Sequence, residues 1–464
     1  MAIVINAIIT VILLYYAYKY ASGGTMIIKH PFKVGEYYEC NNNLSFMIFS
    51  VMTAMVFLGP LSLVKYAIWI FFMLLMSRRW VKKWDGVMTI YLIFILWNLY
   101  TLTYSHYIFQ GWMMIVKFCL PILYFWVGYN AVKEELDLWV FLKRTVLICV
   151  IYSFLIGGVS AKLISPLYGF LCFGTGGTFV AYASLADFYA ILIGIPVMLY
   201  IFTSERKFLY AAGLLFLSSI LESVRTGIGA SILGLSLLFL AYKKGRAVPA
   251  VMLLIALFVG SVFFVKPVKD KMFGKQAETV TISNVGKAKI ETSGREYMWK
   301  MIMNHCYNPN PTFGSGCGGA LGWLKDINSK GGLVLIHSDW VQMMSESGNI
   351  GLCLYILFAV FMLFKVLAIT WRYRNNKMLT LLGGTTVGAF AACFFCMGFD
   401  NVITYAQQGY VLPFMLFGIF LKPIDLTENG EFEDRATQSV INRDFDVPEY
   451  TVTDKDVMLV IKTE

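Results

Sequence analysis

Long apolar runs recur along the chain from its N-terminus almost to residue 421. As helices, such runs are long enough to cross the roughly 30 Å of hydrocarbon in a bilayer. They lack the alternation of apolar and polar positions that a transmembrane β-barrel needs, so only helices satisfy their backbone groups in lipid. The pattern predicts an all-α fold, a polytopic helical membrane bundle with roughly 12–14 transmembrane helices.

The expected spans follow the apolar runs from one polar break to the next. They cover residues 2–20, 45–59, 61–77, 87–105, 111–131, 145–160, 178–203, 208–222, 226–242, 248–265, 347–367, 378–398 and 408–421.

Composition agrees with membrane embedding. Hydrophobic residues make up 58% of the chain and charged residues 14%, against about a quarter charged in soluble domains. The nine cysteines are too scattered for a disulfide framework, and no paired CxxC motif indicates zinc. Cys306 and Cys317 share one polar loop, and whether they pair is left open.

Basic clusters orient the spans, because positively charged loops stay in the cytoplasm. Placing every cluster inside gives a consistent alternation, with the N-terminus outside and the C-terminus inside. The clusters are Lys29–Lys33, Arg78–Lys83, Lys133–Arg144, Glu205–Lys207, Lys243–Arg246 and Arg372–Lys377.

This topology divides the chain into four parts. They are a transmembrane bundle (1–265), an extracytoplasmic loop with the candidate chemistry (266–346), C-terminal transmembrane helices (347–421) and an acidic cytoplasmic tail (422–464). In the loop, Lys and Arg outnumber Asp and Glu, and long loops translocate despite positive charge. The excess suits an anionic partner such as phosphate or pyrophosphate, although headgroup contact alone also explains it.

Ionisable residues within or beside the spans cluster near the outer helix ends. They are Lys65, Lys117, Asp187, Glu222, Arg225, Glu346 and Asp400. Charges are costly in lipid and mark functional candidates. A proton-coupled transporter would more often place acids near the midplane, so the distribution favours a polar cavity open to the outer leaflet.

Three motifs lie on the predicted outer face. The first is Ser223-Val-Arg225-Thr-Gly227-Ile-Gly229. The second is Gly294-Arg295-x-x-x-Trp299, followed by Asn308-Pro309 and the glycine run 314–319. The third is His337-Ser338-Asp339, followed by Glu346-x-Gly348-x-x-Gly351. The run is no P-loop, because no Gly-Lys-Ser/Thr follows it.

Together these motifs resemble the bacterial O-antigen ligase and O-antigen polymerase superfamily of membrane glycosyltransferases, over roughly residues 222–351. The residues Asn310-Pro311-Thr-Phe, between Pro309 and the glycine run, and the long acidic tail depart from the family pattern. The resemblance implies a GT-C-like bundle in the bacterial plasma (inner) membrane. It also implies a metal-independent glycosyltransferase that uses no cofactor and moves a glycan from undecaprenyl pyrophosphate to an acceptor hydroxyl.

The expected roles follow from that chemistry. Arg225 and Arg295 would bind the pyrophosphate leaving group, with Lys117 as a weaker third, since guanidinium groups bind phosphate oxygens bidentately. His337 would act as the base for the acceptor hydroxyl. Asp339 or Glu346 would orient its ring or bind substrate.

Two subclasses share these motifs. A polymerase of O-antigen, capsule or exopolysaccharide extends a carrier-linked glycan, whereas a ligase transfers it to lipid A core, as in lipopolysaccharide synthesis. Polymerase is favoured because polymerases are the more divergent members. A flippase or other transporter is the second alternative, for which we find neither a charged path through the bilayer nor an internal repeat. Expected partners are the carrier-linked glycan, the acceptor, the membrane, and a chain-length regulator or flippase, with no nucleic acid.

Overall fold

A computed structural model describes residues 25–29, 37–41, 80–132, 135–155, 181–221, 225–273, 295–327, 335–404 and 407–428. Within these ranges, six helices are long and apolar enough to cross a membrane. The protein is therefore an all-α, multi-pass membrane bundle, as predicted. A two-stranded hairpin of β1 (Thr25–Lys29) and β2 (Tyr37–Asn41) is added to it, antiparallel with Thr25 opposite Asn41.

The N-terminal half of the described bundle contains α4 (Gly86–Leu102), α5 (Ile108–Ala131), α6 (Glu135–Leu155), α9 (Ala181–Leu192), α10 (Gly194–Thr203), α11 (Arg206–Leu221), α12 (Arg225–Lys243), a 3-10 turn η2 (Lys244–Ala247) and α13 (Val248–Phe264). The C-terminal half contains α17 (Asp339–Arg372), α18 (Lys377–Phe399) and α19 (Gln407–Glu428). Every predicted span from 87 onward coincides with these helices in all or most of its length. The spans 2–20, 45–59 and 61–77, together with Lys65 and Glu222, lie outside the described residues.

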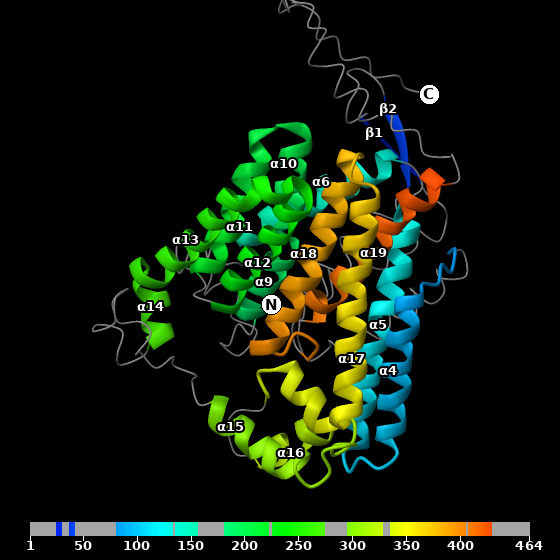
Figure 1. The fold of residues 1–464 in the computed structure, drawn as a ribbon, viewed down its shortest axis with the longest axis vertical. Coiled ribbons are helices and arrows are strands. Elements are labelled where there is room, and N and C mark those ends of the chain that lie inside the picture. The colour runs from blue at the N-terminus through cyan, green and yellow to red at the C-terminus, as the bar shows by residue number, and fades with distance from the viewer. Residues whose placement is uncertain are drawn as a thin grey trace, which may run out of the picture.

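The loop after α13 contains short helical segments in its described residues. It contains α14 (Lys266–Phe273), α15 (Arg295–Ile302), a π-helical turn η5 (Met303–Tyr307) and α16 (Gly319–Ile327). Figure 1 shows α15 and α16 gathered at the lower end of the bundle, at the level of the lower ends of α4 and α17.

Glycines bring α12 and α18 into close antiparallel contact. A Cβ added at Gly234 would lie 3.0 Å from the Gly388 carbonyl oxygen, and one at Gly388 would lie 2.4 Å from the Gly234 oxygen. Small residues of this kind let helix backbones approach in lipid, where packing rather than the hydrophobic effect holds helices together. This contact aligns the start of α12 with the end of α18.

Helices α5 and α19 pack side by side in parallel. Lys117 contacts the segment just before α19, and further along both helices Gly128 faces the Met415 carbonyl and Gly418 faces the Phe125 carbonyl. The relative directions of α5, α12, α17, α18 and α19 thus agree with the alternation predicted from the basic clusters.

The helix α17 breaks at Gly348, where φ is 64° and ψ is −169°. The short helix before the break belongs to the loop end of the molecule, and the long helix after it crosses the bundle (Figure 1). The predicted boundary between loop and span, at 346/347, falls within two residues of this break.

Candidate active site

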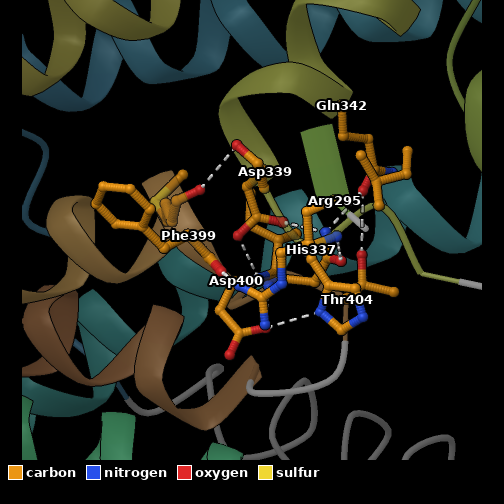
Figure 2. A network of polar contacts seen from close by, with 12 residues as sticks. Arg295, His337, Asp339, Gln342, Phe399, Asp400 and Thr404 are labelled. Atoms are coloured by element: carbon orange, nitrogen blue, oxygen red, sulfur yellow. Dashed lines mark hydrogen bonds and ion pairs between the residues drawn. The ribbon is translucent and has the colours of Figure 1, made fainter. Parts of the chain in front are cut away.

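Four chain segments meet at the loop end of the bundle: the starts of α12, α15 and α17 and the end of α18. The Asp339 backbone N–H donates to the Asp400 carbonyl at 3.3 Å, which joins the start of α17 to the end of α18. Arg295, the first residue of α15, donates from its guanidinium to the Phe399 carbonyl. Two of the three predicted catalytic residues, Arg295 and His337, are therefore held against adjacent residues of one segment (Figure 2).

His337 is fixed by its own backbone. It has φ 56°, a left-handed conformation that is uncommon outside glycine, and its N–H donates to the Asn401 side-chain oxygen. The next residue, Ser338, caps α17 by accepting from the Val341 N–H at 3.3 Å. The sharp turn before this helix sets the direction of the imidazole.

The His337 ring faces Asp400. The distance from its Nδ1 to Asp400 Oδ1 is 3.4 Å, and the Asp400 side chain is 4% exposed against 20% for His337. A buried carboxylate at Nδ1 selects the tautomer with its proton there, so Nε2 is the nitrogen left to accept a proton. The predicted orienting residues were Asp339 or Glu346. The structure assigns that position to Asp400, which sequence reasoning had noted only as a charge at a helix end.

Asp339 contacts the segment that carries Asp400 rather than the His337 ring itself. Its carboxylate accepts from the Ile403 N–H at 3.0 Å and from the Asn401 amide at 3.4 Å. It therefore holds the segment 400–404 that carries Asp400, and does not contact the His337 ring. The ring contacts Asp400, whereas the Asp339 carboxylate contacts Asn401 and the Ile403 N–H, so the two side chains have different partners.

Lys117 contributes to the same segment from α5. Its ammonium donates to the Thr404 carbonyl at 2.8 Å, and the Thr404 hydroxyl donates to the Gln342 amide oxygen at 3.3 Å. The pyrophosphate role predicted for Lys117 is not supported by this position, because the lysine binds a backbone carbonyl and does not line the pocket described next.

Arg225 and Arg295 line one pocket of about 270 Å³, which we call the arginine pocket. Its walls are otherwise mostly apolar and come from α12, α13, α14, α15 and α18. They include Ile228, Phe258, Val262, Val268, Met272, Trp299, Phe395 and Phe399. Two cations in an apolar cleft suit an amphiphilic anion whose charged group and hydrocarbon part lie side by side.

The motif spacing explains how the pocket is built. Arg295 and Trp299 are one helical turn apart on α15, and the Trp299 indole donates to the Ile336 carbonyl at 2.7 Å. This bond ties the arginine motif to the residue just before His337. On α12, a Cβ at Gly227 would lie 3.0 Å from Ala186, so the glycine permits the close approach that places Arg225.

Glu346 binds backbone N–H groups of the loop. Its two carboxylate oxygens accept from the Gly318 and Leu321 N–H groups, both at 3.0 Å, and the Gln342 amide donates to it at 3.2 Å. We call this arrangement the Glu346 clamp. It holds the glycine run and the first turn of α16 against α17, so the predicted role of Glu346 in orienting His337 or binding substrate is not supported.

The glycine run needs glycine because of backbone geometry. Gly316 has φ 88° and Gly318 φ 77°, and a Cβ at Gly318 would lie 2.2 Å from the Gly111 nitrogen. Cys306 and Cys317 are both free and buried beside this run, so they form no disulfide. Burial, with the nearby Glu346 charge adding to it, raises the pKa of the Cys306 thiol to about 12.

Within the described ranges, no three His, Cys, Asp or Glu side chains converge as a metal site would require. In a comparison with known families, residues 210–356 match the family described as O-antigen ligase. The match covers 147 of the 464 residues, and over this segment the chain is similar to the O-antigen ligase family. No curated protein matches the chain.

The family segment contains Arg225, Arg295 and His337, and it ends before Asp400. The superfamily match therefore includes both arginines and the histidine, and only the fold connects them with the carboxylate at the end of α18. In the sequence, the feature that could have indicated a role for Asp400 is the polar pair Asp400-Asn401, which directly follows an apolar span.

Proposed function

We propose that this protein is a glycosyltransferase that moves a glycan from a polyprenyl-pyrophosphate carrier to an acceptor sugar hydroxyl, on the outer face of the bacterial plasma membrane. The single observation that carries the proposal is the arginine pocket, a mostly apolar cleft lined by Arg225 and Arg295, in which Arg295 contacts Phe399 next to the Asp400 partner of His337. Such a cleft suits a lipid-linked pyrophosphate better than a free sugar or a nucleotide.

The chemistry needs one proton transfer and one displacement. Nε2 of His337 takes the proton of the acceptor hydroxyl, whose oxygen attacks the anomeric carbon of the donor. The bond from that carbon to the phosphate oxygen breaks, and its electron pair leaves with the carrier pyrophosphate. Asp400 stabilises the protonated ring, while Arg225 and Arg295 stabilise the negative charge that develops on the leaving group.

We favour polymerase, with a second carrier-linked glycan as the acceptor and no metal ion in the reaction. The match to the family described as O-antigen ligase supports the alternative, transfer to lipid A core, as the second candidate.

Reconstitution in proteoliposomes distinguishes the candidates. The purified full chain is supplied with polyprenyl-pyrophosphate-linked repeat units in the presence of a chelator, with and without lipid A core. Longer carrier-linked chains are the expected result, and transfer to core alone would identify a ligase. Movement of the carrier across the bilayer without a new glycosidic bond would overturn the proposal.

A further inference from the structure

A second groove lies at the opposite end of the bundle from the arginine pocket. It has a volume of about 510 Å³ and runs between the last turns of α12 and α17. The lining residues are Leu240, Ala241, Phe364, Leu367, Ala368, Thr370, Trp371 and Arg374. Nothing in the proposed transfer reaction uses it.

The walls of this groove are shaped for hydrocarbon. Phe364 and Trp371 are 70% and 67% exposed, and Ala368 is exposed between them. Behind them α18 contributes Gly383 and Gly384, and a Cβ at Gly384 would lie 3.2 Å from the Ala241 side chain. The absence of side chains on these two glycines lets α18 pack closely against both α12 and α17, since a Cβ at Gly383 would lie 2.0 Å from the Thr370 hydroxyl oxygen.

One end of the groove is basic. Arg374 lines it just beyond the end of α17, with its guanidinium carbon 5.8 Å from the centre of the Trp371 ring. Lys243 is the last residue of α12, two positions after the lining residue Ala241, and its ammonium lies 4.6 Å from the centre of the Tyr242 ring. No acidic side chain lines the groove in the part of the chain that the structure describes.

An apolar groove between membrane helices with cations at its end fits an anionic lipid. The acyl chain fills the groove, and the headgroup phosphate meets Arg374 at the level where Trp and Arg anchor membrane proteins. By the basic-cluster topology, this end faces the cytoplasmic leaflet, where attraction of anionic lipid to each basic residue contributes about 1 kcal/mol.

We propose that the groove between α12 and α17 is a binding site for an anionic glycerophospholipid of the cytoplasmic leaflet. The positive charge of Arg374 at the end of the groove selects an anionic headgroup, and the apolar walls of the groove bind the acyl chain. This site is separate from the proposed transfer site, so either proposal stands if the other fails.

The test is lipid binding to the purified full chain in mild detergent, followed by native mass spectrometry. The probes are dioleoylphosphatidylglycerol and the zwitterionic dioleoylphosphatidylcholine. Two variants separate the headgroup from the chain: Arg374→Ala removes the rim cation, and Ala368→Trp fills the groove. Both positions are exposed, so neither change disturbs the core.

Matched controls are Arg206→Ala, an exposed arginine at the start of α11, and Ala256→Trp, an exposed alanine on α13. The thermal unfolding midpoint without added lipid verifies that each variant is folded. We expect the wild type to prefer phosphatidylglycerol, and Arg374→Ala to lose about fivefold of that affinity, as about 1 kcal/mol implies.

Ala368→Trp is expected to weaken both lipids, while the two controls bind as the wild type does. Equal binding of both lipids to the wild type would overturn the proposal. So would wild-type affinity for phosphatidylglycerol in either groove variant, or an equal loss in the controls.

Discussion

The arginine pocket and the Glu346 clamp lie at the same end of the bundle and are built from the same loop, yet their charged groups have opposite surroundings. In the clamp, each oxygen of a buried carboxylate accepts from a backbone N–H group of the α16 region. In the pocket, Arg225 and Arg295 line a cleft with mostly apolar walls, and the half-buried His337 contacts Asp400, next to the Phe399 that binds Arg295.

These different surroundings indicate different roles: the charge in the clamp stabilises the fold, and the charges in the pocket serve the reaction. A charge whose hydrogen-bonding capacity is used by the backbone holds the fold, because its removal leaves buried N–H groups without acceptors. Arg295 also donates to a backbone carbonyl, that of Phe399, but a guanidinium has five N–H donors, so an arginine that lines a cleft can still bind a ligand. By this comparison, the loop motifs contain both kinds of residue, although they look alike in the sequence.

The largest expected effect is on the chemical step. His337→Ala removes the proposed base and is expected to lower the transfer rate by about 10² to 10⁴, the usual contribution of general base catalysis. Arg295→Ala removes a leaving-group partner and is expected to cost about 10² to 10³. Both are measured as glycan formed per folded molecule in proteoliposomes, and a rate near wild type in either would remove that residue from the mechanism.

A smaller loss is expected at Asp400. Asp400→Asn keeps the shape of the side chain and removes its charge, and we expect the rate to fall about tenfold to 100-fold, the loss seen when a carboxylate that orients a metal-bound histidine is removed. The rate is measured per folded molecule in the same proteoliposomes, and a rate equal to that of the wild type would show that Asp400 only supports the fold.

In the Glu346 clamp the loss is expected in stability rather than rate. Glu346→Ala leaves two backbone N–H groups without acceptors, at a cost of about 1–3 kcal/mol each. Glu346→Gln is the matched control, since one amide oxygen still accepts one of them. Thermal unfolding in detergent is expected to rank wild type above Gln above Ala, and a normal unfolding midpoint in the Ala variant would contradict the clamp.

The smallest effect is expected at Cys306. Its pKa of about 12 leaves the thiol protonated at neutral pH, and alkylating reagents react with the thiolate. Iodoacetamide at neutral pH is therefore expected to label it little in the folded protein and readily after denaturation, and reducing agents are expected to leave transfer unchanged. Rapid labelling of folded protein at Cys306 would show that the region around the glycine run opens.

The sequence predicted the helices well because each apolar run is a local property of its segment. It also singled out Arg225, Arg295 and His337 as candidates, since each stands in a short motif whose spacing reflects one turn or one helix start. The roles of Asp339, Glu346 and Asp400 depend on contacts between distant segments. His337 and Asp400 are 63 residues apart, and only the packing of α17 against α18 brings them together.

The most direct test of the central claim compares His337→Ala with Glu346→Ala in one assay, with the transfer rate and the folded fraction measured on the same proteoliposomes. We predict that His337→Ala keeps its folded fraction and loses its rate per folded molecule, whereas Glu346→Ala loses folded protein and keeps its rate per folded molecule. The reverse pattern, or an equal loss of rate per folded molecule in both, would contradict the distinction between the arginine pocket and the Glu346 clamp.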